Sequence, residues 1–188
     1  WIYKHTIYYL LKRATGLQNG RFFPTAGSLL SEPINEFLNA VDIPIIIGYG
    51  LSETCATVSA YPERGFVLSS IGEVFEGIEV RIAPEDNEIQ LRGETIMPGY
   101  YHNEAANAEA FTEDGWFRTG DAGRLEGRTL FFTERLKDLY KTANGKYIAP
   151  QQIENLLTSH RLFEQVAVVA DGYKFVSALI YPNWSLLI

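Results

Sequence analysis

The chain has 188 residues, of which 46% are hydrophobic and 13% aromatic, and its net charge is −7. This composition indicates a folded globule with a sizeable core and excludes a disordered tail. The single cysteine, Cys55, excludes a disulfide framework. Because no apolar run approaches the roughly 18 residues of a membrane span, we expect a cytoplasmic, reducing environment.

Charge is unevenly distributed along the chain. Residues 73–126 hold thirteen acids against four arginines, a local balance of −9. Because phosphate contacts supply most nucleic-acid affinity, we expect no nucleic-acid partner. Residues 1–24 hold four cations and no acid. That pattern fits an ordinary solvated helix face, and it leaves open a weak peripheral membrane contact.

The first sixty residues alternate between helical and strand patterns. Apolar residues at helical spacing predict a helix over residues 2–16. A capping serine and an early proline predict a second helix over 32–40. Strands are predicted at 21–25 and 43–47, the latter apolar on both faces, as in a covered parallel sheet. This order predicts part of a doubly wound α/β layer.

A sheet of that type binds ligands just beyond the carboxyl ends of its strands. The two predicted strands lead into the small-residue turn Ala26-Gly27-Ser28 and into the loop Gly48–Thr54. We therefore take these two loops as candidate site loops. Cys55 follows the second loop, and we interpret it as a packing residue rather than a reactive thiolate.

Beyond Ser59 the pattern changes to short strands separated by turns, which predicts a β-rich subdomain. Its predicted elements are strands at 72–74, 78–82, 88–91, 121–125 and 129–133 and a helix at 104–111.

The last fifty residues have their own alternation of strand and helix. Gly145 predicts a hairpin turn, and Pro150 opens a helix whose Ile153, Leu156 and Leu157 should face inward. The predicted strands are 139–142, 146–148, 165–170 and 175–181.

These patterns together predict an α/β (α+β) chain in three parts. We expect a partial doubly wound α/β layer at residues 1–60 and a β-rich subdomain at 61–134. A partial, small α+β C-terminal domain is expected at 139–188, with the boundary at 135–138.

Three motifs occur in order along the chain. Gly48–Thr54 reads Gly-Tyr-Gly-Leu-Ser-Glu-Thr, and Gly115–Asp121 reads Gly-Trp-Phe-Arg-Thr-Gly-Asp. Arg135-Leu136-Lys137-Asp138 is followed by Lys141 and Gly145. These motifs resemble the Tyr-Gly-x-Thr-Glu loop, the Gly-Trp-x-x-Thr-Gly-Asp motif and the interdomain joint of the adenylate-forming ligase superfamily. The chain looks most like a bacterial AMP-forming long-chain acyl-CoA synthetase, with Ser52 in place of the usual threonine.

The resemblance implies an ATP site in the first loops. Tyr49 would stack on adenine beside Gly50, and Gly27 and Ser28 would bring main chain against the other side of the base. Without the motif, Tyr49 would be a core tyrosine at a strand end.

The same loop would hold the phosphates and their metal. Ser52 would offer a hydroxyl to the phosphates and Glu53 a hard oxygen ligand to Mg²⁺, and both would take part in catalysis. A helix cap and a solvated first-turn acid are the ordinary alternatives.

The later motifs would complete the site. Asp121 would accept hydrogen bonds from both ribose hydroxyls, although a turn aspartate is the ordinary alternative. Arg135 would reach the ribose and phosphates, and Lys137 would be the hinge. Lys141 would be a catalytic residue that lies near the phosphates in one orientation and near the CoA thiol tunnel in the other.

The implied activity joins a fatty acid to CoA at the expense of ATP, with Mg²⁺. The carboxylate would attack the α-phosphate to give an acyl-adenylate, and the CoA thiol would then displace AMP. The family's phosphate loop and adenylation lysine are expected outside these 188 residues, so we expect the piece alone to be inactive. An aryl-CoA ligase, a peptide-synthetase adenylation domain and a non-catalytic nucleotide-binding or interaction module stay open, as does the oligomeric state.

Overall fold

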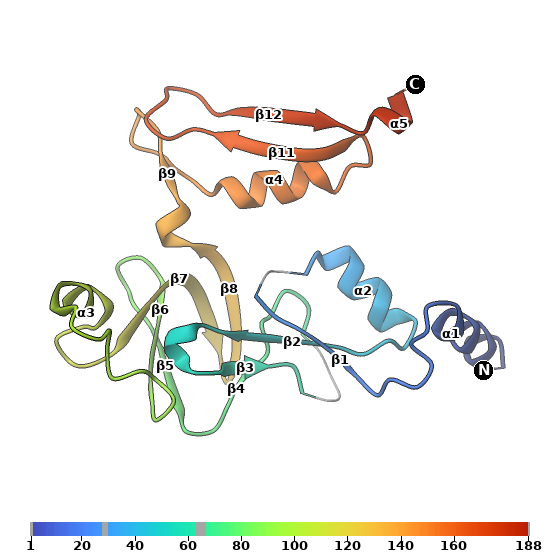
Figure 1. The fold of residues 1–188 in the computed structure, drawn as a ribbon, viewed down its shortest axis with the longest axis horizontal. Coiled ribbons are helices and arrows are strands. Elements are labelled where there is room, and N and C mark those ends of the chain that lie inside the picture. The colour runs from blue at the N-terminus through green and yellow to red at the C-terminus, as the bar shows by residue number, and fades with distance from the viewer. Residues whose placement is uncertain (1, 28–29, 63–66, 188) are drawn as a thin grey trace. The chain divides into compact units, whose positions relative to one another are not determined.

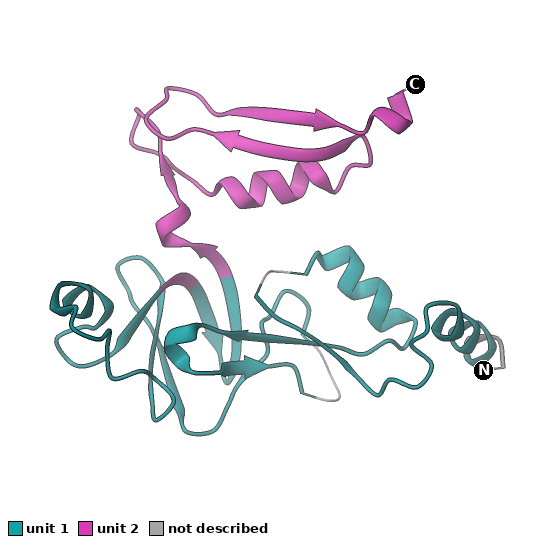
Figure 2. Cartoon of the chain, in the orientation of Figure 1, with its two compact units in different colours: residues 1–119, 123–132 teal, residues 120–122, 133–188 magenta. Residues whose placement is uncertain are grey.

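A computed structural model describes residues 2–27, 30–62 and 67–187 (Figure 1). Its contacts divide the chain into two compact units (Figure 2). Unit 1 comprises residues 1–119 and 123–132, and unit 2 comprises residues 120–122 and 133–188. The domain limits expected from the sequence patterns stay predictions.

Unit 1 begins with the predicted order of helix, strand, helix and strand. These elements are α1 (Ile2–Ala14), β1 (Phe23–Thr25), α2 (Glu32–Ala40) and β2 (Ile45–Gly50). β1 and β2 pair in parallel, as predicted. Helix α1 ends two residues early because Gly16 adopts a left-handed turn, with φ of 75°.

Strand β2 differs from the prediction in both position and neighbours. It starts at Ile45 and extends through Tyr49 to Gly50, so part of the predicted site loop is strand. The extension arises because β2 pairs in parallel with β1 on one edge and antiparallel with β3 (Thr57–Ala60) on the other. Only Ile47 of the strand is fully buried, so β2 is not the completely covered strand that its apolar run suggested.

The α/β layer and the β-rich region share one mixed sheet of eight strands in the order β1-β2-β3-β4-β8-β7-β6-β5. The fold class is therefore α/β with a mixed sheet, and strand pairing joins the first two predicted regions. The further elements are β4 (Glu73–Val74), β5 (Ile78–Ile82), β6 (Glu88–Gly93), α3 (Glu104–Ala110), β7 (Phe117–Glu126) and β8 (Thr129–Arg135).

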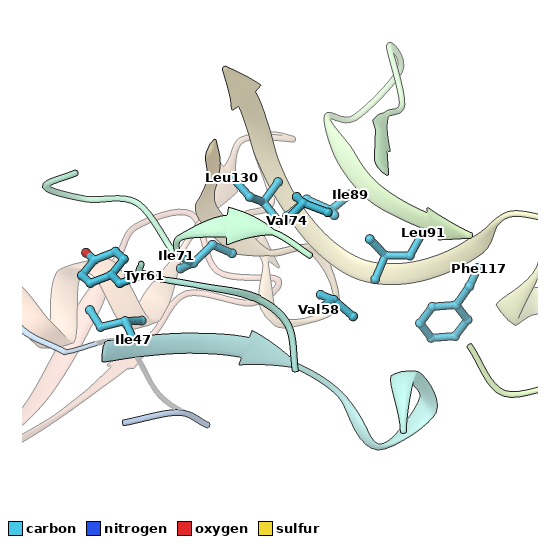
Figure 3. Packing of buried hydrophobic residues seen from close by; sticks show 9 residues of the cluster. All are labelled: Ile47, Val58, Tyr61, Ile71, Val74, Ile89, Leu91, Phe117 and Leu130. Carbon is cyan, nitrogen blue, oxygen red and sulfur yellow. The ribbon is translucent and has the colours of Figure 1, made fainter. Parts of the chain in front are cut away.

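The core of unit 1 lies on this sheet. Ile89, Leu91, Val58 and Leu130 are fully buried and come from three different strands, β6, β3 and β8. The central β7 and β8 are longer than predicted because they continue across this core. The clustered residues in Figure 3 are Ile47, Val58, Tyr61, Ile71, Val74, Ile89, Leu91, Phe117 and Leu130.

The described residues of unit 2 form two small antiparallel sheets and two α-helices. A single 3₁₀ turn, Leu136–Asp138, follows β8 and leads into the hairpin of β9 (Tyr140–Lys141) and β10 (Tyr147–Ile148). Helix α4 (Pro150–Thr158) packs on β11 (Phe163–Val169), which pairs with β12 (Ser177–Pro182), and α5 (Trp184–Leu187) follows (Figure 1).

The buried face of α4 is rotated from the predicted one. Ile153 and Leu157 are partly buried, whereas Leu156 is 74% exposed, so its predicted inward position is wrong. The cause is Glu154, whose carboxylate accepts a hydrogen bond of 2.7 Å from the Val168 amide of β11. This bond places residues 153, 154 and 157 toward the sheet.

The apolar stripe predicted for α1 is not a core face in this structure. Ile7 and Leu10 are 48% and 56% exposed. Within residues 2–27, 30–62 and 67–187, no helix has both the length and the apolar character needed to cross a bilayer.

Candidate nucleotide site

The end of β2 carries the first candidate residues, Tyr49 and Gly50. The Tyr49 ring is partly buried and packs against the core cluster, so the expected core contact is present while part of the ring stays exposed. At Gly50 the backbone of Ala56 approaches so closely that a Cβ would collide with its carbonyl oxygen. Glycine is therefore required where β2 and β3 change register.

The loop after β2 is a tight 3₁₀ turn, Ser52–Thr54. Leu51, not Ser52, occupies the N-cap position, so a capping role for Ser52 is wrong. Thr54 closes the turn: it is fully buried, accepts a hydrogen bond from the Leu51 amide at 3.0 Å, and lies 2.6 Å from the Ala56 carbonyl oxygen, to which it donates. The Ser52 side chain is left exposed at the surface of this fixed turn.

Glu53 has a specific partner. The Tyr100 hydroxyl donates a hydrogen bond of 2.8 Å to the Glu53 carboxylate, and the Met97 amide donates one of 2.7 Å to the Glu53 carbonyl oxygen. The carboxylate raises the pKa of the Tyr100 phenol, because the bond stabilises its protonated form. Glu53 is therefore an oriented carboxylate rather than merely a solvated first-turn acid.

The remaining loop of this unit is described only in part. Gly27 has φ of 86°, and no described atom lies within 4 Å of the position that a Cβ would take. No described residue therefore fills the space that a side chain at residue 27 would take. Ser28 lies outside the described residues.

Unit 2 brings together Asp121 and Arg135. Asp121 lies in β7 and is 1% exposed, whereas the Arg135 side chain, at the end of β8, is 51% exposed. Arg135 Nε donates to Asp121 Oδ1 at 3.1 Å. The pair joins a buried carboxylate to a cation that reaches solvent, and a simple turn role for Asp121 is wrong because the residue lies within a strand.

Lys137 lies beside this pair. Its aliphatic carbons run over Gly120, where an added Cβ would be 3.3 Å from Lys137 Cε. Gly120 also has φ of 71°, so glycine is favoured there by both space and conformation. Two cations, Arg135 and Lys137, thus border the segment that carries Asp121.

The predicted catalytic Lys141 is placed elsewhere in unit 2. It lies on β9, where its amide donates to Asp171 at 3.3 Å and its ammonium group lies 5.6 Å from the centre of the Tyr147 ring. Neither contact involves Asp121 or Arg135, and the catalytic role of Lys141 stays a prediction.

The Gly-Trp-Phe-Arg-Thr-Gly-Asp motif is held in place by contacts that the sequence alone did not predict. The Trp116 ring is flanked by the guanidinium groups of Arg81 and Arg92, at 4.7 and 4.5 Å from its centre. Arg118 pairs with the buried Glu88 at 3.0 Å, and Thr119 donates to the Ile89 carbonyl at 2.7 Å. These contacts fasten the start of β7 to its neighbouring strands just before Asp121.

Glu53 is also the residue considered for Mg²⁺. The described residues contain no group of three or more histidine, cysteine, aspartate or glutamate side chains suited to hold a metal. Mg²⁺ bound with a nucleotide usually keeps several waters and takes one or two carboxylates plus substrate phosphates. The oriented Glu53 carboxylate and the exposed Ser52 hydroxyl are oxygen groups with which that kind of binding would be compatible.

No protein-family profile matches the chain. Among curated proteins, a long-chain-fatty-acid–CoA ligase of Mycobacterium bovis is 37% identical over 180 residues, which are 95% of this chain and 30% of that protein. A long-chain-fatty-acid–CoA ligase of Saccharomyces cerevisiae is 34% identical over 92% of this chain and 26% of that protein. A 2-succinylbenzoate–CoA ligase of Listeria innocua is 37% identical over 87% of this chain and 36% of that protein. The chain thus spans about a third of the length of these relatives.

Solved structures show the same fold. The unliganded O-succinylbenzoate–CoA synthetase of Bacillus subtilis matches with a TM-score of 0.71 and 26% identity, over 85% of this chain and 37% of that one. The same enzyme in complex with ATP and magnesium matches with a TM-score of 0.72 and 25% identity, over 90% of this chain and 40% of that one.

The fold of the chain, with its mixed sheet, is therefore that of these solved enzymes. In sequence, the relatives of the chain are AMP-forming acyl-CoA ligases, and its structural neighbours are adenylate-forming ligases.

Proposed function

We propose that the chain is the nucleotide-binding and hinge-containing part of an ATP-dependent long-chain-fatty-acid–CoA ligase. The observation that carries the proposal is the buried Asp121 carboxylate held by Arg135 at 3.1 Å, between two motifs of the superfamily. One carboxylate accepts hydrogen bonds from two neighbouring hydroxyls, as a ribose diol requires. The Arg135 guanidinium spans the distance from this carboxylate to solvent, where phosphates would lie.

The adenine base is assigned to residues of unit 1. We assign Tyr49 to stacking on one side of the adenine, and Gly27 and Ser28 to main-chain contact with its other side. We assign Gly50 to the nucleotide site as the glycine next to Tyr49 at the end of β2. The partly exposed Tyr49 ring and the space at Gly27 that no described residue fills support this assignment.

We assign Ser52 to the phosphates and Glu53 to Mg²⁺. When bound, the ion would neutralise charge on the phosphate oxygens. The chain's part is to hold an oriented carboxylate in the turn that Thr54 closes.

The proposed reaction has two halves. A carboxylate oxygen of the fatty acid bonds to the α-phosphorus of ATP, and the bond to the bridging oxygen breaks with release of pyrophosphate. The CoA thiol then loses its proton and bonds to the acyl carbon, and AMP leaves. Positioning and charge stabilisation are the protein's main contributions to such chemistry.

Lys137 and Lys141 are assigned to the domain rotation that takes place between the two half-reactions. The single 3₁₀ turn at Leu136–Asp138 supports Lys137 as the hinge, since a few backbone torsions at an element's end can absorb a domain rotation. Lys141, at the edge of the β9–β10 hairpin, is proposed to serve the second half-reaction. Fatty acid, ATP and CoA are the proposed partners, in a cytoplasmic setting with at most weak membrane contact.

The complete gene product that contains this chain provides the test. With ATP, Mg²⁺, CoA and palmitate it should form palmitoyl-CoA and AMP, and exchange of pyrophosphate into ATP should depend on the acid. Failure to bind ATP or to form any thioester would refute the ligase function. The 188 residues alone should form no acyl-CoA, and thioester formation by them would refute that expectation.

An aryl-acid CoA ligase is the second candidate, because 2-succinylbenzoate–CoA ligases stand among the relatives at 37% identity. Assays with palmitate and with 2-succinylbenzoate in parallel separate the two substrates. A non-catalytic nucleotide-binding module would bind ATP without turnover of either acid, and a peptide-synthetase domain would activate an amino acid.

A further inference from the structure

The Glu53 carboxylate is held by a segment far from it in the sequence. Residues 97–100 contact Glu53 twice: the Met97 amide bonds its carbonyl oxygen at 2.7 Å, and the Tyr100 hydroxyl bonds its carboxylate Oε1 at 2.8 Å. Two contacts three residues apart fix both the backbone and the side chain of Glu53. The hydroxyl engages one carboxylate oxygen, which directs the group without covering it.

Tyr100 is itself fixed by helix α3. The Asn107 side chain accepts a hydrogen bond of 2.6 Å from the Tyr100 amide and donates one of 3.0 Å to the Tyr100 carbonyl. This pair of hydrogen bonds to the backbone of one residue resembles the pairing between neighbouring β-strands. Asn107 stands on α3, whose first turn is capped by the Asn103 side chain through a bond of 3.1 Å from the Ala106 amide.

Gly99 makes this arrangement possible. Its φ is 145°, and a Cβ there would lie only 2.9 Å from Asn107 Oδ1. A side chain at residue 99 would therefore push Asn107 away from Tyr100. The order of support runs from α3 through Asn107 and Tyr100 to Glu53, and all of it lies within unit 1.

We infer that Tyr100 is a positioning residue for the metal-binding carboxylate of Glu53, and that Asn107 sets the place of Tyr100. This inference rests on the proposed function, because it assigns Glu53 to the Mg²⁺ of the bound nucleotide. The hydroxyl does not touch substrate. It restricts the rotamers of Glu53, so that one carboxylate oxygen is presented in a single direction.

Partners that orient a metal ligand in this way matter for affinity: their loss typically weakens metal binding about 10- to 100-fold. Tyr100→Phe removes only the hydroxyl and keeps the ring. Tyr101→Phe is the matched control, because Tyr101 is the next residue, is also a tyrosine, and is 89% exposed. Asn107→Ala removes the two hydrogen bonds that hold the Tyr100 backbone and so acts on the Tyr100–Glu53 contact indirectly.

The experiment measures ATP affinity of the complete gene product by calorimetry, with Mg²⁺ and with EDTA. Tyr100→Phe should weaken binding of Mg²⁺–ATP about tenfold and leave metal-free ATP unchanged. Asn107→Ala should act in the same direction, and Tyr101→Phe should match the parent protein. A role in folding alone would lower both affinities together, and thermal melting of each variant checks that it is folded.

The outcomes separate the inference from the function. If Glu53→Gln weakens Mg²⁺–ATP binding and Tyr100→Phe does not, the positioning role is wrong while the ligase function stands. If Glu53→Gln also has no effect, the metal role of Glu53 is wrong and the inference falls with it. If the parent protein binds no ATP, the proposed function itself is overturned, and so is everything that rests on it.

Discussion

The substitution Asp121→Asn tests whether Asp121 binds the ribose or only stabilises the fold. Asparagine has nearly the same shape as aspartate and keeps an acceptor oxygen for Arg135 Nε, but it carries no charge and presents an amide donor in place of the second oxygen. In the proposed site, one of the two ribose hydroxyls loses its acceptor. The substitution should therefore weaken nucleotide binding more than it weakens the fold.

The structure sets the magnitudes. A hydrogen bond to a charged group contributes about 1.5–3 kcal/mol, so ATP affinity should fall about 10- to 150-fold. The cost to the fold is smaller because the Arg135 side chain is 51% exposed and water can solvate it. We expect about 1 kcal/mol of lost stability, between exposed and buried ion pairs, and a melting temperature lower by about 2–4 °C.

The assay is calorimetric binding of ATP, 2′-deoxy-ATP and 3′-deoxy-ATP to the parent protein and the variant. In the parent protein, each deoxynucleotide should bind more weakly than ATP. In Asp121→Asn at least part of that difference should disappear, since the lost acceptor no longer distinguishes the hydroxyl. If the variant discriminates between ATP and both deoxynucleotides as strongly as the parent does, Asp121 does not contact the ribose.

Three further predictions concern the fold around the site. Ile89→Ala, in the fully buried core, should cost about 2–5 kcal/mol in denaturant unfolding, whereas Ile7→Ala, at a 48% exposed position, should cost far less; equal losses would contradict the core assignment. Gly123→Ala should destabilise the chain markedly, because its Cβ would collide with the Phe131 carbonyl and lie 2.7 Å from Ile89 Cδ1; an unchanged melting temperature would show that the strands can separate there. The Arg81 guanidinium, and then the Thr112 hydroxyl, lower the pKa of Asp114 from 3.8 to about 2. The stabilisation by this ion pair is therefore complete above the unfolded pKa and is lost as pH falls from about 3.8 to 2. In Asp114→Asn the denaturant midpoint of unfolding should therefore fall less steeply with decreasing pH over this range than it does in the parent protein. An unaltered slope would count against the Arg81–Asp114 pair.

Much of the fold could be predicted from local patterns. The helix at Glu32–Ala40 and the strand at Ile78–Ile82 occur at their predicted bounds, because capping, proline placement and alternation are properties of neighbouring residues. The joining of β2 to β3 could not be predicted in this way. Strand pairing between distant segments leaves little trace in either segment alone, so the single mixed sheet emerged only from the structure.

The candidate site shows the same division. Asp121 and Glu53 could be selected because the family motifs contain them, and their assigned roles stay predictions. Tyr100 carries no comparable signal, since its part depends on a contact across 47 residues. Cys55 was interpreted as a packing residue, yet it is exposed, because it takes a left-handed conformation with φ of 56° at the end of the 3₁₀ turn. A property of the turn, not of the residue type, decides its exposure.

The closed turn at Thr54 gives residue 52 an unusual freedom to vary. Because the buried Thr54 hydroxyl holds the backbone, the residue at 52 need not shape the loop and can be chosen for its hydroxyl alone. Serine lacks the second Cβ substituent that restricts threonine to fewer rotamers. In the proposed site, its hydroxyl would therefore sample more orientations before it contacts a phosphate. The present sequence thus places a hydroxyl with more rotamers on a turn whose backbone is held by two hydrogen bonds of Thr54.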